Sequence, residues 1–211
     1  NGFAMGDDDV TLITLASEKS DFYDVPENVS RVALDCMAAS KGLLSALRRN
    51  RQRVSLIKDT LRTLSPDVTI SFCTETNILV LLAGKRLATK IVITEHLDPV
   101  KASYGRVWET LRRCTYPVAD CLVSVSNGVR QGFSWMPASK NRVIYNPISV
   151  LESSDKFDVP AVCDQSKKWI SSMGRLENQK GFDVLLDAIA IARERLKEWQ
   201  VCIIGDGPLR R

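Results

Sequence analysis

Two basic residues flank a turn near the C-terminal end of the sequence. Arg175 and Lys180 stand between a strand predicted over residues 169–173 and a helix predicted over residues 181–196. The N-terminus of a helix presents unpaired N–H groups and partial positive charge, so two added cations make it a strong anion site. Arginine grips a phosphate through two hydrogen bonds and lysine adds a mobile charge, which indicates a diphosphate ligand. Taken singly, either residue would more simply be a surface cation.

Two glycines follow the next predicted strand, residues 200–204. Gly205 and Gly207 permit a tight turn and a close approach of the backbone to a ligand. The pair matches only the first half of a dinucleotide fingerprint, and Pro208 stands where the following helix should begin. The glycines are therefore informative only together with Arg175 and Lys180.

Short strands and helices alternate along the rest of the chain. Strands are predicted over residues 10–15, 29–34, 68–72, 90–94, 121–125 and 142–145, and helices over residues 42–64, 76–88, 103–115 and from about 126. Such alternation predicts a parallel sheet with helices on both faces, with 68–72 as a buried strand. Ligands of these sheets sit at the carboxyl ends of the strands, where Glu95, His96 and Ser126 stand.

The predicted fold is α/β with two Rossmann-like domains. Residues 1–148 form the first domain, 149–168 a linker without periodicity, and 169–211 the beginning of the second domain. The first strand of the N-terminal domain is expected to precede Asn1, and the C-terminal domain to be about half present. The apolar residues expected on the buried face of the last helix are Phe182, Leu185, Leu186 and Ile189.

The composition excludes several classes of protein. The 211 residues are 45% hydrophobic, with no apolar run near the ~20 residues of a membrane span and no visible secretory signal. The six cysteines are scattered singly, and one histidine cannot build a zinc site with them. We therefore expect a cytoplasmic protein with reduced thiols and no metal.

A basic cluster lies in the predicted helix 42–64. The segment Arg48 to Arg53 contains four arginines in a chain whose net charge is only +4. Such a cluster attracts phosphates of nucleic acids, lipid head groups or a pyrophosphate-bearing substrate, although a solvated helix face is an equally good explanation. Aromatic residues make up 7% of the chain and none interleaves the cluster, so we expect no nucleic-acid partner. Peripheral contact with an anionic membrane fits better.

The motifs taken in order resemble those of glycosyltransferase family 4. The C-terminal matches are Gly174-Arg175-Leu176, Lys180-Gly181 and Gly205-x-Gly207-Pro208, and the N-terminal ones are Thr94-Glu95-His96, Val123 to Ser126 and Val143 to Pro147. The resemblance implies a GT-B fold and a retaining reaction without a metal. It also implies that the C-terminal domain holds a nucleotide sugar, usually a UDP-sugar, and that the N-terminal domain receives the acceptor.

The resemblance also implies roles for individual residues. Arg175 and Lys180 would hold the donor diphosphate and stabilise the charge that develops on it. His96 would lie near the transferring sugar, although a histidine satisfied by local hydrogen bonds is as good an explanation from sequence. The nucleotide-sugar site implied by the resemblance comprises Gly174, Arg175, Lys180, Gly205, Gly207 and Ser126.

Two family features have no counterpart in this sequence. A pair of glutamates seven residues apart would follow Arg211, and a glycine-rich loop would precede Asn1, so we expect the chain as given to be inactive. The segments Ser71 to Asn77 and Thr94 to Pro99 look like those of bacterial enzymes that build exopolysaccharide, capsule or lipopolysaccharide.

The sequence therefore predicts a glycosyltransferase that moves a hexose or N-acetylhexosamine from a UDP-sugar to a lipid-linked or oligosaccharide acceptor. It would act in the cytoplasm, at the inner face of the membrane. One alternative is a UDP-sugar epimerase of the same fold, because fold does not determine the reaction. Another alternative is a non-enzymatic module that binds phosphate or nucleic acid through the basic cluster.

Overall fold

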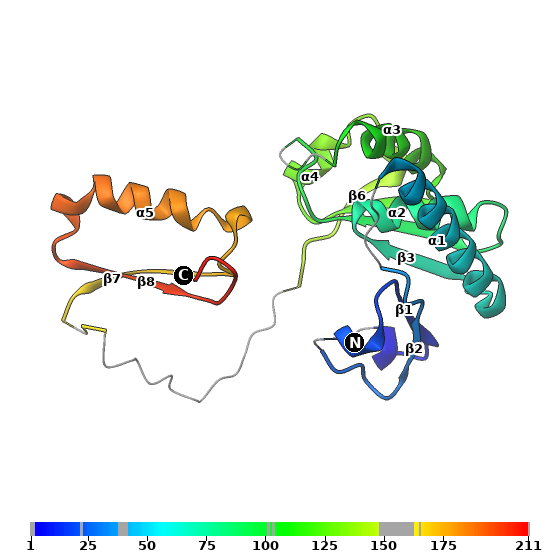
Figure 1. Cartoon of the computed structure of the whole chain (residues 1–211), viewed down its shortest axis with the longest axis horizontal. Coiled ribbons are helices and arrows are strands. Elements are labelled where there is room, and N and C mark those ends of the chain that lie inside the picture. The colour runs from blue at the N-terminus through cyan, green and yellow to red at the C-terminus, as the bar shows by residue number, and fades with distance from the viewer. Residues whose placement is uncertain are drawn as a thin grey trace. The chain divides into compact units, whose positions relative to one another are not determined.

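The chain forms two compact units, Asn1–Ile148 and Ser149–Arg211 (Figure 1). The computed structural model describes residues 3–21, 23–37, 42–100, 102, 104–147, 163–164 and 166–210. Most of the predicted linker, residues 149–162 and 165, lies outside the described residues. The two units are therefore considered one at a time.

Unit 1 contains two parallel sheets. The first pairs β1 (Val10–Thr14) with β2 (Val29–Ala33). The second has the order β3 (Val68–Phe72), β4 (Lys90–Glu95), β5 (Cys121–Ser124), β6 (Asn141–Val143). All of its neighbours are parallel, as predicted, so the carboxyl ends of its strands meet at one edge. That edge carries His96 and Ser126.

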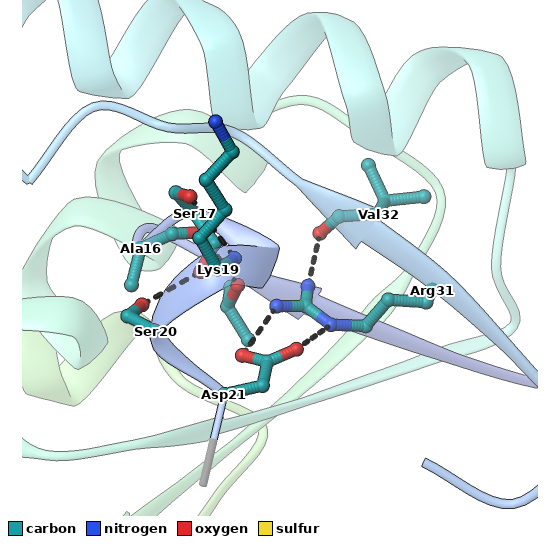
Figure 2. Close-up of polar contacts among 8 residues, drawn as sticks. Ala16, Ser17, Lys19, Ser20, Asp21, Arg31 and Val32 are labelled. Carbon is teal, nitrogen blue, oxygen red and sulfur yellow. Dashed lines mark hydrogen bonds and ion pairs between the residues drawn. The ribbon is translucent and has the colours of Figure 1, made fainter. Parts of the chain in front are cut away.

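The connection between β1 and β2 is held by an arginine fork (Figure 2). Arg31 donates from Nε and Nη2 to the two carboxylate oxygens of Asp21, at 3.0 and 2.9 Å, and from Nη1 to the carbonyl of Val32 at 2.9 Å. Ser17 caps the short 3-10 turn Glu18–Ser20 that precedes Asp21. A paired guanidinium of this kind fixes the crossover loop against β2 without an α-helix.

In the described part of unit 1, four α-helices connect the strands: α1 (Leu43–Leu64), α2 (Thr74–Gly84), α3 (Arg106–Thr115) and α4 (Asn127–Gly132). Figure 1 shows α1, α2 and α3 on one face of the four-stranded sheet. The core between them and the sheet includes the fully buried Ile78, Ile93 and Leu122. The expectation of a buried strand over 68–72 is wrong.

Strand β3 is exposed on the face away from these helices. Its residues Val68, Ile70 and Phe72 are 52%, 38% and 55% exposed, whereas Ser71 between them is 3% exposed. Because successive side chains of a strand point to opposite faces, the three apolar residues all lie on the open face, and Ser71 lies on the covered one. A run of β-branched and apolar residues does not distinguish this case from a strand that is covered on both faces.

Two helices begin at positions different from those predicted, for reasons of backbone geometry. Helix α2 begins at Thr74 instead of residue 76, because Cys73 adopts a positive φ of 72° and its carbonyl accepts from the N–H of Asn77. Helix α3 begins at Arg106 instead of residue 103, after Gly105 with φ of 86°. A residue with positive φ directly before a helix turns the backbone sharply, so the helix begins at the next residue.

Unit 2 pairs β7 (Lys168–Met173) with β8 (Trp199–Ile204) in parallel, and α5 (Phe182–Ile191) connects them. The predicted helix 181–196 is therefore shorter, and a 3-10 turn, Arg193–Leu196, follows it. Phe182, Leu185 and Ile189 are half-buried, but Leu186 is 53% exposed, so its predicted place on the buried face is wrong. A two-stranded sheet is too narrow to cover a wide stripe of the helix.

Candidate active site

The sole histidine of the chain lies at the carboxyl edge of the four-stranded sheet. His96 directly follows β4 and is exposed to solvent. Its ring is tilted by 46° against the ring of Phe72, the last residue of β3, with 6.0 Å between the ring centroids. The structure thus places an imidazole where ligands of parallel sheets bind, beside an exposed aromatic ring. This placement is compatible with the role expected from sequence, which remains a prediction.

A buried carboxyl group lies immediately before His96. Glu95 is 2% exposed and accepts hydrogen bonds from the hydroxyl of Thr74, at 2.8 and 3.0 Å, and from the hydroxyl of Tyr116. Asn77 donates from Nδ2 to the carbonyl of Thr94 at 2.9 Å and to the Tyr116 oxygen at 3.3 Å. We call Glu95, Thr74, Asn77 and Tyr116 the Glu95 cluster.

Burial determines the electrostatics of this cluster. Removal from water raises the pKa of Glu95, while hydrogen bonds from Tyr116 and Thr74 and the positive charge of Arg112 act in the opposite direction. Burial, followed by the negative charge of Glu95, also raises the pKa of Tyr116, so its hydroxyl remains a donor. The sequence placed Glu95 at a strand end but did not identify it as a site residue. The sequence signal that could have identified it is a carboxyl residue at the end of a strand whose centre is apolar.

Ser126 has a local structural role. It is the N-cap of α4, and its hydroxyl accepts a hydrogen bond from the N–H of Val129 at 3.2 Å. The structure places it after β5 at the same edge as His96, but its hydroxyl is already used in the cap. A ligand contact at Ser126 therefore stays a prediction.

The two glycine turns of unit 2 interlock at the carboxyl ends of β7 and β8. The N–H of Gly174 donates to the carbonyl of Ile204 at 3.0 Å, and that of Leu176 to Asp206 at 2.9 Å. A Cβ added at Gly205 would lie 1.9 Å from the carbonyl oxygen of Gly174. One added at Gly207 would lie 2.5 Å from that of Leu176. Only glycine permits this approach, which joins the two turns predicted from separate motifs.

The cations are presented by the first of these turns. Arg175 is 75% exposed in its side chain and forms an ion pair with Glu177, with 2.5 Å between Nη2 and Oε1. Lys180 is exposed at the end of the 3-10 turn Asn178–Lys180. Its side chain passes close to Gly174, since a Cβ added at Gly174 would lie 3.7 Å from Lys180 Cδ. Gly181, with φ of 65°, then begins α5 without a side-chain cap. Uncapped N–H groups and two cations therefore share one turn.

Each unit presents its own candidate groups: the turn of unit 2 has the N–H groups and cations that suit an anion, and the carboxyl edge of unit 1 exposes an imidazole. Within the described ranges, no three His, Cys, Asp or Glu side chains gather into a group that could hold a metal ion. None of the helices in the described part of the chain has the length and apolar character that a membrane span requires. Sequence reasoning found the cations and glycines, but missed Glu177 as the partner of Arg175.

Comparison with known proteins gives the same assignment for both units. Residues 2–148 match the model of the Glycosyl transferase 4-like domain, and residues 154–211 match that of Glycosyl transferases group 1. A similar curated protein is GalNAc-alpha-(1->4)-GalNAc-alpha-(1->3)-diNAcBac-PP-undecaprenol alpha-1,4-N-acetyl-D-galactosaminyltransferase of Campylobacter jejuni subsp. jejuni serotype O:2. It is 26% identical over 204 residues, which are 96% of this chain and 55% of the relative.

Solved glycosyltransferases share the fold. The lipopolysaccharide outer core galactosyltransferase WaaB is similar with a TM-score of 0.56 and 21% identity, over 86% of this chain and 47% of that one. Anabaena HepE in complex with UDP is similar with a TM-score of 0.55 and 15% identity, over 85% of this chain and 48% of that one. The chain thus spans about half the length of the relatives it matches, and its two units have the GT-B architecture predicted from sequence. This chain belongs to the glycosyl transferase 4-like family.

Proposed function

We propose that the protein transfers a hexose or N-acetylhexosamine from a UDP-sugar to a lipid-linked or oligosaccharide acceptor in polysaccharide biosynthesis. The observation that carries this proposal is the pair of interlocked glycine turns that present Arg175 and Lys180 at the N-terminus of α5. The similar Campylobacter enzyme is named for an undecaprenol-linked acceptor, and the similar HepE structure contains UDP. The Campylobacter name supports a lipid-linked acceptor, and the HepE complex supports a nucleotide-sugar donor.

The proposed chemistry depends on stabilising the leaving group. As the bond between the sugar and the diphosphate breaks, negative charge accumulates on the diphosphate, and Arg175, Lys180 and the N–H groups of α5 stabilise it. Gly174, Gly205 and Gly207 would shape the two turns that meet the nucleotide. In unit 1, His96 would position a hydroxyl of the sugar or acceptor, and Ser126 would contact the donor. We propose that the reaction retains the anomeric configuration and uses no metal.

The test is a double variant of the whole protein, Arg175→Ala with Lys180→Ala. We expect UDP-sugar turnover to fall by at least about 100-fold, because removing one preorganised donor to a developing anion already costs about that much. Lys197→Ala is the matched control, since Lys197 is also an exposed cation of unit 2 in an ion pair, with Glu194, but it lies after the 3-10 turn Arg193–Leu196 at the other end of α5. Unchanged turnover in the double variant would remove the proposed role of the turn.

The same assay separates transfer from epimerisation. UDP-sugar incubated without an acceptor should remain unchanged, and the appearance of an epimerised nucleotide sugar would favour the epimerase alternative. The anomeric configuration of the glycoside product, read from its proton coupling constant, tests retention.

A second proposal concerns the face of unit 1 formed by the start of α1. Arg48 and Arg51 are exposed there, next to Leu44 and Leu47, which are 85% and 62% exposed. No acidic residue occurs in α1 before Asp59. Apolar side chains beside arginines on one helix face suit an anionic bilayer surface, where each nearby cation adds about 1 kcal/mol of attraction. We propose that this face rests on the inner side of the membrane, near a lipid-linked acceptor.

Vesicle sedimentation tests this surface. Binding of the chain to vesicles with anionic lipid should exceed binding to neutral vesicles, and Arg48→Gln with Arg51→Gln should abolish the difference. Arg62→Gln is the control, because Arg62 lies at the other end of α1 with Asp59 3.9 Å away. Equal binding to both vesicles would exclude an electrostatic mechanism, and retention of RNA at physiological salt would favour the nucleic-acid alternative.

A further inference from the structure

The Glu95 cluster joins the two segments that carry the exposed rings of the candidate site. Glu95 directly precedes His96 on β4, and Thr74 follows Phe72 after one residue, at the start of α2. The hydroxyl of Thr74 reaches both carboxylate oxygens of Glu95, so one carboxyl group connects the end of β4 to the turn after β3. His96 and Phe72 are therefore held by the same pair of side chains.

We propose that Glu95 is a positioning residue, which fixes the end of β4 so that His96 meets the sugar substrate in one orientation. This inference rests on the proposed function and adds to it a residue that touches neither donor nor acceptor. Its carboxyl group acts through the backbone of β4 and through its hydrogen bonds with Thr74 and Tyr116.

The burial of the cluster favours a specific role. Thr74, Asn77 and Tyr116 are 1%, 0% and 0% exposed, and Arg112, 5% exposed, acts on Glu95 electrostatically. Polar groups that leave water must find partners, and apolar residues in their place would often stabilise a fold as well or better. Hydrogen bonds join all four side chains of the cluster, although Asn77 Oδ1 has no partner among the described residues, and such a network favours one arrangement over others.

The position of the cluster in the sheet supports the same conclusion. The remainder of the buried face of β4 is aliphatic, with Ile91 and Ile93 at 7% and 0% exposure. Polar burial thus concentrates at the carboxyl edge, directly below His96. Backbone strain occurs at the same edge, since Cys73, between Phe72 and Thr74, has a positive φ of 72°. A side chain such as His96, if it must hold its position to about 0.5 Å, requires a buried network of this kind beneath it.

The decisive variants each remove one threonine hydroxyl, either just after the carboxyl end of β3 or near its amino end. Thr74→Val deletes the hydroxyl that binds Glu95, and Thr74→Ser restores it. Thr69→Val, the control, deletes a hydroxyl that lies 2.9 Å from that of Thr89 at the amino end of the strand. Tyr116→Phe removes the second donor to Glu95 while it keeps the ring.

Two measurements are made on each variant. In the whole protein we expect Thr74→Val and Tyr116→Phe to lower kcat by about 10-fold or more with KM within about 3-fold, because misplacing a group by 1 Å costs up to about 100-fold. Thr74→Ser and Thr69→Val should stay within about 3-fold of wild type. In the chain itself, His96 is the only histidine, so its imidazole resonance should shift in Thr74→Val and Tyr116→Phe alone.

The outcomes separate this inference from the proposed function. If Thr74→Val and Tyr116→Phe fold and match Thr69→Val in both kcat and the His96 resonance, Glu95 is not a positioning residue. Should Thr74→Val fail to fold, Tyr116→Phe decides by the same two measurements. Absence of transfer in the wild-type whole protein would overturn the proposed function, whereas the His96 resonance would still decide whether the cluster orients the imidazole.

Discussion

The two groups of candidate site residues are held in place by opposite means. In unit 1 an exposed His96 stands on a buried network of side chains around Glu95. In unit 2 the exposed Arg175 and Lys180 stand on two turns joined by backbone contacts at glycines. Side-chain support fixes the direction of one ring, which suits a group that must meet a sugar in one orientation. Backbone support fixes the turn and leaves the long cations exposed to solvent, where they can adjust to an anion.

The largest expected effect is on the backbone support of unit 2. Gly205→Ala would place a Cβ 1.9 Å from the carbonyl oxygen of Gly174, so one of the two turns must move. We expect unit 2 to lose roughly 3 kcal/mol of unfolding free energy, at the upper end of overpacking costs, and to lose UDP binding. Trp169 and Trp199 lie in unit 2, and Trp108 and Trp135 in unit 1, so their indole NMR signals in urea report each unit separately.

Gly128→Ala is the matched control in unit 1. A Cβ there meets only the hydroxyl oxygen of Ser126 at 3.7 Å, an ordinary contact, and Gly128 lies within α4. Alanine should be neutral or stabilise the helix by up to about 1 kcal/mol. Equal tolerance at Gly205 and Gly128 would show that the turns of unit 2 are not locked by their backbones.

A smaller effect is expected from changing the shape of a cation while its charge is kept. Arg175→Lys preserves the positive charge but removes the planar fork that binds two phosphate oxygens. We expect UDP affinity in the whole protein to fall by about 10-fold, the equivalent of one charge-assisted hydrogen bond. Lys180→Arg should change affinity less, because lysine there acts as a mobile point charge. Isothermal titration with UDP measures both, and equal affinities for Arg175→Lys and wild type would argue against bidentate binding.

The sequence predicted the backbone-supported site better than the side-chain-supported one. The residue types of Gly205 and Gly207 predicted a tight turn with a close approach to a ligand, and the structure shows a close approach to the backbone of the neighbouring turn; the signals for these glycines and for β7 and β8 are local. The partners of Glu95 lie 21 residues away, at Thr74 and at Tyr116. No local pattern states which side chains meet across a fold. Sequence could therefore place Glu95 at a strand end but could not show its contacts.

Errors in the predicted burial have the same origin. Leu186 and Ile70 have the residue types of a core, and their periodicity is correct for a helix and a strand. Leu186 is exposed because the sheet beside α5 has two strands, and Ile70 because it lies on the open face of its sheet. These properties belong to the assembled fold, whereas periodicity describes one element at a time.

The buried carboxyl group of unit 1 predicts a dependence of stability on pH that unit 2 should lack. Burial raises the pKa of Glu95 above its ordinary value of 4.5, so the folded unit binds this proton more tightly than the unfolded chain. Its contribution to stability is complete below the unfolded pKa and is lost as pH rises through the folded pKa. The slope for one proton is at most about 1.4 kcal/mol per pH unit.

Glu95→Gln tests this dependence, because glutamine does not titrate. Between pH 4.5 and 9.0, the ordinary pKa of the thiols that burial raises at Cys36 and Cys73, the unfolding free energy of unit 1 should no longer decline with rising pH in the variant, as followed by the signals of Trp108 and Trp135 in urea. The signals of Trp169 and Trp199 should show the same pH profile in both proteins. A parallel decline in wild type and variant would mean that Glu95 is ionised over the whole range.

The smallest effect is expected at Glu177, which forms an ion pair with Arg175. The pair is largely exposed, with side-chain exposures of 75% for Arg175 and 28% for Glu177, so it is worth only about 0.2–1 kcal/mol. In the proposed site a diphosphate would displace this carboxylate, so Glu177→Gln should raise UDP affinity by about 2- to 5-fold, with a smaller gain at high salt. Glu194→Gln, which releases Lys197, is the control and should leave the affinity unchanged. A weaker affinity in Glu177→Gln would show that Glu177 orients Arg175 for the ligand. The two units would then share one strategy, in which a carboxylate fixes the group that meets the substrate.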